Sequence, residues 1–133
     1  MDVWILRYPE PRSRPGAAWK MIILQRTADG EESEIDAIEI EARSPTLEEI
    51  VTHQLDRGRT RLVLDLSHVK HLDSSDLAQV LAAFKQVTEQ NGALGIANPN
   101  PRIREILRIT RMEEVLPLFE SVEEAAEQQL AGG

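Results

Sequence analysis

Residues 61–77 read RLVLDLSHVKHLDSSDL: a nearly continuous apolar run, a short polar loop and the first turn of an amphipathic helix. The run over residues 61–66 is typical of a strand that is covered on both faces of its sheet. From Ser74 to Gln90 the apolar positions recur at helical spacing, and Asn91-Gly92 predicts the end of that helix. The residues expected to face inward are Leu77, Val80, Leu81, Phe84 and Val87. A buried strand followed directly by a helix predicts an α/β fold.

The same alternation continues downstream. Residues 93–97 and 115–119 are short apolar runs that predict two more strands. Asn100-Pro101 predicts the start of a third helix, because proline is favoured at the first helical position. Its expected inward residues are Ile103, Ile106, Leu107 and Thr110. The capping-box sequence Ser121–Glu124 predicts the start of a fourth helix.

Upstream, the chain predicts one helix and a pair of strands. The helix has Leu47, Ile50, Val51 and Leu55 on one face, and Gly58 ends it. Either a capping box over residues 46–49 or Ser44-Pro45 begins it. Residues 20–26 are an apolar strand, and apolar and charged residues alternate from Ile38 onward. We expect these two strands to form a hairpin around Asp29-Gly30, in a polar loop that also contains Glu31, Glu32 and Glu34.

The segment Pro9–Gly16 contains three prolines, which cannot donate to a sheet ladder. It separates the apolar residues 3–6 from the rest, so we expect residues 1–18 to be an appended arm or edge strand and residues 19–133 to be the folded domain. The predicted order is β-β-α-β-α-β-α-β-α. It indicates a single α/β domain in which a mixed sheet is flanked by about four helices.

Composition excludes several classes of function. The chain has 133 residues, a formal net charge of −8 and no cysteine. The acidic balance argues against nucleic acid or an anionic membrane as the main partner. The lack of cysteine excludes disulfides and thiolate chemistry. No apolar run approaches the roughly 20 residues that a membrane span needs, and no cationic region precedes an apolar stretch at the N-terminus, so we expect a cytoplasmic protein.

The loop 67–76 is the candidate functional segment, because it follows the carboxyl end of the central strand. A metal site from His68 and His71 lacks ligands on a rigid element. A serine nucleophile would need a glycine elbow, which is missing. A third interpretation is a phosphoacceptor at Ser74, at the N-terminus of the predicted helix. On these residues alone, the simpler interpretation is that Asp73 or Ser74 caps the helix. Asp65 is expected either to hydrogen-bond this loop or to face outward.

The ordered set of motifs resembles the STAS domain of bacterial anti-sigma factor antagonists. In that family an apolar strand ends in Asp-Leu-Ser, and Asp-Ser-(Ser/Thr)-Gly-Leu-Gly opens a helix; here residues 61–73 are followed by Ser-Ser-Asp-Leu. The resemblance continues through residues 93–98, the helix 101–112 and the ending 115–125. It covers residues 46–130 well, residues 20–45 loosely and residues 1–18 not at all.

The resemblance implies a regulated binding module and not an enzyme, without catalytic, metal or cofactor sites. Ser74 would be phosphorylated by a partner that is both an anti-sigma factor and a GHKL-type serine kinase. The unphosphorylated protein would bind that partner and free the sigma factor, and a serine phosphatase would restore binding. The expected partner contacts are Asp73, Ser75, Asp76 and Leu77. The process would be transcription regulation in bacterial stress signalling.

The sequence departs from the family at two glycines. Asp76 and Ala78 stand where the family has glycine, and Asp76 adds bulk and a permanent negative charge beside Ser74. That charge would hinder kinase docking or partly mimic phosphate. The segment 41–46 also lacks the usual Gly-(Glu/Arg)-(Leu/Ile)-Asp. A second hypothesis therefore stays open: a constitutive STAS adaptor, either a stress-signalling scaffold subunit or the partner of a lipid-transport ABC ATPase, in which Ser74 is structural.

Overall fold

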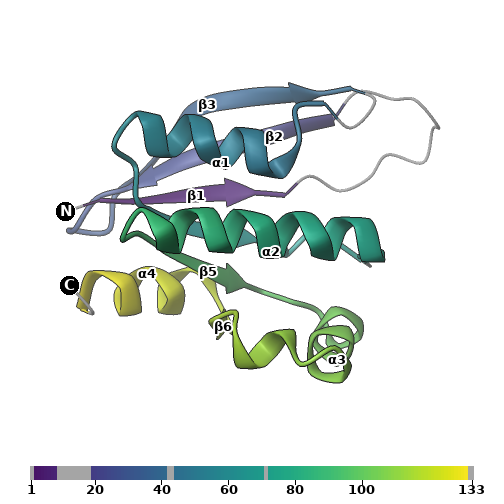
Figure 1. Ribbon diagram of the computed structural model, residues 1–133. Coiled ribbons are helices and arrows are strands. Elements are labelled where there is room, and N and C mark those ends of the chain that lie inside the picture. Colours follow the sequence, from purple (N-terminus) through teal and green to yellow (C-terminus); the bar gives the residue numbers. More distant parts are fainter. Residues whose placement is uncertain (1, 9–18, 42–43, 71, 132–133) are drawn as a thin grey trace.

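The structure is a computed structural model that describes residues 2–8, 19–41, 44–70 and 72–131. The predicted order of elements is confirmed, with one additional strand at the beginning (Figure 1). The elements are β1 (Val3–Arg7), β2 (Trp19–Arg26), β3 (Glu32–Ile40), α1 (Leu47–Asp56), β4 (Arg61–Asp65), α2 (Ser74–Glu89), β5 (Ala93–Ala97), α3 (Pro101–Ile109), the 3-10 helix η1 (Met112–Glu114), β6 (Leu118–Phe119) and α4 (Val122–Ala131).

The strands form one six-stranded sheet in the order β3-β2-β1-β4-β5-β6. The strands β1, β4, β5 and β6 run parallel, whereas β2 is antiparallel to both β1 and β3. The predicted mixed sheet and the hairpin of β2 with β3 are therefore confirmed. Because the parallel strands share one direction, their carboxyl ends meet at one edge of the sheet, where the loop to α2 begins.

The position of β1 corrects the expectation for the N-terminal segment. We expected an arm or edge strand, but β1 lies between β2 and β4 in the middle of the sheet. Its Leu6 packs in the core on one face of the sheet, and Val3 and Ile5 pack in the core on the other. These side chains are fully buried on both faces, which requires an inner strand. The proline-rich segment 9–18 lies outside the described residues.

Helices cover both faces of the sheet (Figure 1). Buried residues of α1, α2 and α3 share the larger core, whereas α4 packs on the opposite face through Ala125 and Ala126. The buried stripe of α2 consists of Leu77, Val80, Ala83 and Val87. Leu81 and Thr110 were expected to face inward and are exposed instead. Thr110 is the C-cap that follows the last residue of α3, and Leu81 lies outside the buried stripe of α2.

Three element boundaries differ from the sequence expectation or choose between its alternatives. β3 begins at Glu32 and not at Ile38, because Glu32 pairs with Arg26 across the hairpin at 2.7 Å. The last strand keeps only Leu118–Phe119. Thr46 caps α1 in a capping box with Glu49, which confirms the first of the two proposed starts.

No helix in the described part of the chain is long and apolar enough to span a membrane.

Candidate functional site

Helix α2 begins with a reciprocal pair of hydrogen bonds between two aspartates. Asp73 is the N-cap and has an extended backbone, and its Oδ1 accepts from the backbone N–H of Asp76 at 2.8 Å. In return, Asp76 Oδ2 accepts from the backbone N–H of Asp73 at 3.1 Å. Of the two cap candidates, Asp73 is therefore the cap. Ser74 is the first helical residue.

The side chain of Ser74 is exposed, and its hydroxyl forms no hydrogen bond within the described ranges. Because Asp73 is the residue that caps the helix, the Ser74 hydroxyl has no structural role in the cap. It stands beside the backbone N–H groups of the first turn, where the helix dipole favours negative charge. The arrangement leaves this hydroxyl accessible to a modifying enzyme.

The other predicted contact residues are divided between surface and core. Asp73 and Ser75 are exposed, Asp76 is half-buried and Leu77 is buried. Leu77 packs in the larger core. A partner that docks on the first turn of α2 would therefore contact the two aspartates and the serines. Leu77 packs in the core beneath this turn and is not available for contact.

Asn100 fastens the loop that precedes Ser74 to the start of α3. Its Nδ2 donates to the carbonyl oxygens of Val69 at 3.0 Å and Lys70 at 2.8 Å. Its Oδ1 accepts from the backbone N–H of Ile103 at 2.8 Å and so caps α3. Val69 and Leu72 are buried, which anchors the loop to the core as well. Hydrogen bonds to its backbone and the burial of its apolar side chains therefore both fix the position of the loop.

Asp65 is a buried carboxylate at the carboxyl end of β4, with only 3% of its surface exposed. Its Oδ1 accepts from the backbone N–H of Ser67 at 3.0 Å and from Asn98 Nδ2 at 3.1 Å. Its Oδ2 lies 3.5 Å from Arg7 Nε. The first of the two alternatives for Asp65 is therefore correct: it hydrogen-bonds the loop. It also ties together β1, β4 and the residue that follows β5.

Sequence reasoning missed the roles of Arg7 and Asn98 here. Arg7 belongs to the N-terminal segment that carried no family signal. Asn98 has a φ of +58°, in the left-handed region that asparagine tolerates. An asparagine directly after a buried strand was the only local signal for it.

Of the two histidines considered as metal ligands, the structure describes only His68. His68 is exposed, and His71 lies outside the described residues. No group of three His, Cys, Asp or Glu side chains in the described part of the chain could hold a metal ion.

Two arginines of α3 form ion pairs. Arg104 pairs with Glu120 at 3.0 Å. The hydrogen bond from Arg108 holds the pKa of the Glu105 carboxyl below its usual value.

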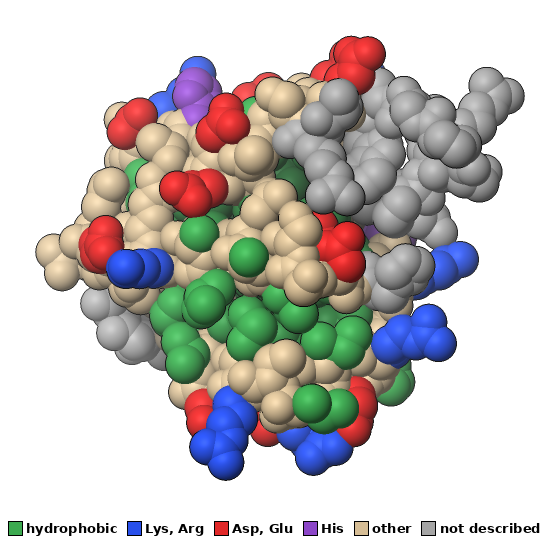
Figure 2. Space-filling view, turned by 45° about the vertical axis from the view of Figure 1, so that its right-hand side comes forward, with side chains coloured by type: hydrophobic (Ala, Val, Ile, Leu, Met, Phe, Trp, Pro, Cys, Tyr) green, Lys and Arg blue, Asp and Glu red, His purple; other side chains and the backbone are tan. Residues whose placement is uncertain are grey.

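An apolar area lies on the face that includes the start of α2. Figure 2 shows hydrophobic side chains gathered at the centre of this face, with basic side chains along its lower edge. Among the residues that the structure describes, the large exposed hydrophobic side chains are those of Leu81 on α2, Ile109 at the end of α3 and Val115 after η1, which are 42%, 67% and 53% exposed. Exposed apolar patches rimmed by charge are typical of protein-binding surfaces.

Comparison with known proteins identifies relatives for most of the chain. The family model of the STAS domain matches residues 34–125. A protein of Bordetella bronchiseptica, BtrV, named as a candidate anti-sigma factor antagonist, is 33% identical over 85 residues, or 64% of this chain and 73% of that protein. The anti-sigma F factor antagonist of Paenibacillus polymyxa is 23% identical over 78 residues, or 55% and 67%. The chain spans 66% of the length of a Thermotoga neapolitana relative, to which it is 28% identical.

Solved structures show the same fold. The crystal structure of TM1081 from Thermotoga maritima superposes with a TM-score of 0.61 at 21% identity, covering 66% of this chain and 76% of that one. An anti-sigma-factor antagonist (STAS) domain protein from Planctomyces limnophilus gives a TM-score of 0.54, covering 83% and 96%. With the sheet order, the helix that starts at Ser74 and the match over residues 34–125, the chain belongs to the STAS domain family.

Proposed function

We propose that the protein is an anti-sigma factor antagonist whose binding to an anti-sigma factor is ended by phosphorylation of Ser74. The partner in this proposal is a GHKL-type serine kinase, and a serine phosphatase restores the active form. The observation that carries the proposal is the exposed Ser74 hydroxyl, which follows the capping Asp73 and forms no hydrogen bond within the described ranges. Relatives named as anti-sigma factor antagonists support the general role.

The electrostatics of the first turn support a switch of this kind. A phosphate on Ser74 would add about −1.5 to −2 charges next to Asp73 and Asp76. One unit charge placed about 5 Å from an acidic group of the partner costs roughly 3 kcal/mol at an effective dielectric near 20. About 2.8 kcal/mol lowers affinity 100-fold. A single phosphate is therefore sufficient to release a partner that presents a carboxylate at this turn.

Leu81 provides an apolar contact surface on the helix that carries the switch. Leu81 is on the same helix as Ser74, seven residues along, and its exposed side chain has no place in the core. In the proposed complex, Leu81 is covered by the partner while Ser74 faces the kinase active site. Burial of Leu81 against the partner contributes to the affinity, and the charge on Ser74 determines whether the partner binds.

The test is a paired capture from a lysate of the source organism, with Ser74→Ala and Ser74→Glu proteins as baits. Ser75→Ala is the matched control, because it removes the hydroxyl of the neighbouring exposed serine without adding charge. The proposal predicts a GHKL-type kinase that is held by the Ser74→Ala and Ser75→Ala forms and lost by the Ser74→Glu form.

The constitutive adaptor is the competing function, and one observation favours it. Asp76 places a permanent carboxylate in the capping box, where the family has glycine. If this charge already substitutes for phosphate, binding does not depend on Ser74. An ABC ATPase or a second STAS protein captured equally by the Ser74→Ala and Ser74→Glu baits would establish the adaptor and overturn the phosphorylation switch.

A further inference from the structure

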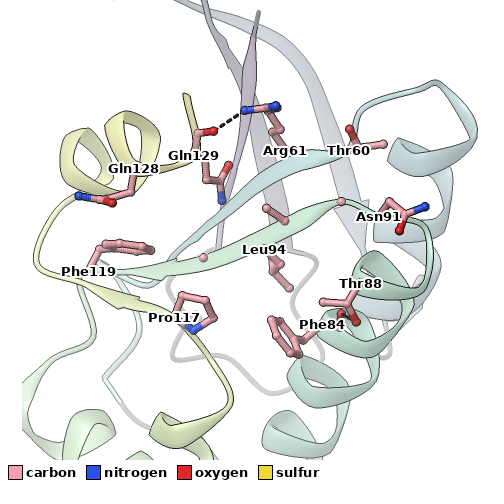
Figure 3. A pocket seen from close by; sticks show the side chains of 13 residues that line it. Thr60, Arg61, Phe84, Thr88, Asn91, Leu94, Pro117, Phe119, Gln128 and Gln129 are labelled. Atoms are coloured by element: carbon pink, nitrogen blue, oxygen red, sulfur yellow. Dashed lines mark hydrogen bonds between the residues drawn. The ribbon is translucent and has the colours of Figure 1, made fainter. Parts of the chain in front are cut away.

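A cavity of about 470 Å³ lies at the opposite end of α2 from Ser74. It opens between the last turns of α2 and the helix α4, with β5 behind it (Figure 3). Thr88 lines the cavity and is 14 residues beyond Ser74, which is about 21 Å along the helix axis. The volume falls in the range of roughly 300–1,000 Å³ that small-molecule sites occupy. This site is therefore separate from the proposed switch.

The back of the cavity contains an unpaired stretch of sheet edge. The odd-numbered residues of β5 point their backbone groups at β4: Ala93 N–H donates to Thr60 O at 2.8 Å, and Ala97 O accepts from Leu66 N–H at 2.9 Å. The even-numbered residues point the other way, and Ile96 N–H donates to Pro117 O at 2.8 Å.

Leu94 is the even-numbered residue beyond the reach of the two-residue β6. Its backbone N–H and C=O face the cavity side, and no hydrogen bond links them to any residue in the described ranges. Only 2% of Leu94 is exposed. Buried backbone groups are nearly always paired, so these two require a water or a ligand.

A second unpaired acceptor lies on α4. Gln129 Nε2 donates to the carbonyl oxygen of Leu62 at 2.7 Å, which fixes the orientation of the amide, because a flipped amide would set two oxygens against each other. Its Oε1 is buried and has no hydrogen-bond partner in the part of the chain that the structure describes. Gln129 lines the cavity in Figure 3. A ligand that satisfies this oxygen must carry a donor.

The cavity also has a cation and an apolar wall. Arg61 lies at its upper side in Figure 3 and donates to the backbone oxygen of Gln129. No carboxylate in the described ranges forms an ion pair with Arg61. Phe84, Pro117 and Phe119 line the other side. A partly buried guanidinium without an acid favours an anion, and the rings favour an apolar body.

We propose that this cavity binds a small amphipathic carboxylic acid whose polar end also carries an N–H or O–H donor. The carboxylate pairs with Arg61 and accepts from the Leu94 N–H. The donor satisfies Gln129 Oε1, and the apolar body lies between Phe84, Pro117 and Phe119. Arg61, the Leu94 N–H and Gln129 Oε1 then each have a partner of the complementary kind, which a purely apolar ligand would not provide, and a water remains to pair with the Leu94 carbonyl oxygen.

The test is a titration of the isotope-labelled protein with N-acetyl-phenylalanine, followed through the backbone amide resonances of Leu94 and Gly95. N-acetyl-phenylalaninamide is the matched probe, since it has the same apolar body and backbone N–H with a neutral amide in place of the carboxylate. We expect saturable shifts at both amides, at least tenfold weaker binding of the uncharged probe, and at least tenfold weaker binding by Arg61→Gln. Arg57→Gln, an exposed arginine outside the cavity, should bind like the unchanged protein.

A second variant keeps the proposal testable if Arg61→Gln fails to fold. Thr88 is exposed and its hydroxyl bonds only carbonyls of its own helix, so Thr88→Phe should fold and obstruct the cavity. We expect it to abolish the shifts. Absence of saturable shifts in the unchanged protein would mean a cavity filled by water only. Equal affinity for both probes, or unchanged binding by Thr88→Phe, would likewise overturn the proposal.

Discussion

Ser74 and Ser75 are neighbouring exposed serines in the first turn of α2, and only one of them is the proposed phosphoacceptor. Ser74→Ala should abolish phosphorylation by the partner kinase while Ser75→Ala retains it, which intact-mass and fragment spectra will show. Because Asp73 is the cap, Ser74→Ala should change the free energy of unfolding by no more than about 0.5 kcal/mol. Phosphate found on Ser75 of the Ser74→Ala protein would place the acceptor one residue later.

Asp76 combines a structural bond with a charge, and two substitutions separate them. Asp76→Asn keeps an oxygen that accepts from the Asp73 N–H and removes the charge, whereas Asp76→Gly removes both. Both variants should be phosphorylated faster than the unchanged protein, since a like charge beside Ser74 is gone. Initial rates with the partner kinase measure this. Rates equal to that of the unchanged protein would contradict the electrostatic argument.

At this scale the sequence predicted more about caps than about side-chain networks. Asp73 was a cap candidate because aspartate before an amphipathic helix is a local signal. The donation from Asn100 to Val69 O and Lys70 O joins residues about 30 positions apart, and only the tertiary fold brings them together. The Arg7–Asp65 pair was missed for the same reason.

The loop before α2 depends on its attachment to α3. Asn100→Ala removes the α3 cap and two bonds to the loop, and it should lower the free energy of unfolding by roughly 2–3 kcal/mol. Asn100→Ser keeps a side-chain oxygen that can cap α3 and loses the donors to the loop, so it should cost less. Urea denaturation measures both, and hydrogen exchange at Val69 and Leu72 should quicken in each. Equal stability of Asn100→Ala and the unchanged protein would show that the loop does not need this attachment.

The elements themselves were largely predictable from periodicity. The bounds of β5 and the start of α3 agree with the sequence expectation, because apolar runs and an Asn-Pro start are local signals. The start of β3 was placed too late because its first residues are exposed and acidic, which is typical of loops. The last strand was placed too early, because Val115 and Leu116 are apolar but lie outside the ladder.

At the scale of the whole molecule, β1 joins the hairpin β2–β3 to the parallel strands. Ile5 is fully buried in this strand, so Ile5→Ala should lower the free energy of unfolding by about 2–5 kcal/mol. Ile22→Ala, in the neighbouring β2 and half-buried, is the matched control and should cost less. Denaturant titration compares them. An Ile5→Ala protein as stable as the control would mean that the domain does not depend on β1.

The alternation of strands and helices was enough to predict the fold class, but not the place of β1. Strand order depends on pairings between distant segments, and Pro9–Gly16 separates β1 from its partners in the sequence. The four consecutive apolar residues 3–6 are consistent with an inner strand that is buried on both faces. A run of four residues is too short to distinguish an inner strand from an edge strand.

The most direct test of the central claim is the dissociation constant of the captured anti-sigma kinase for two forms of this protein. One form is unphosphorylated, and the other carries phosphate on Ser74 alone. The account predicts that phosphorylation weakens binding about 100-fold or more, which corresponds to about 2.8 kcal/mol. Equal dissociation constants for the two forms would contradict it and leave Ser74 as an ordinary first-turn residue of α2.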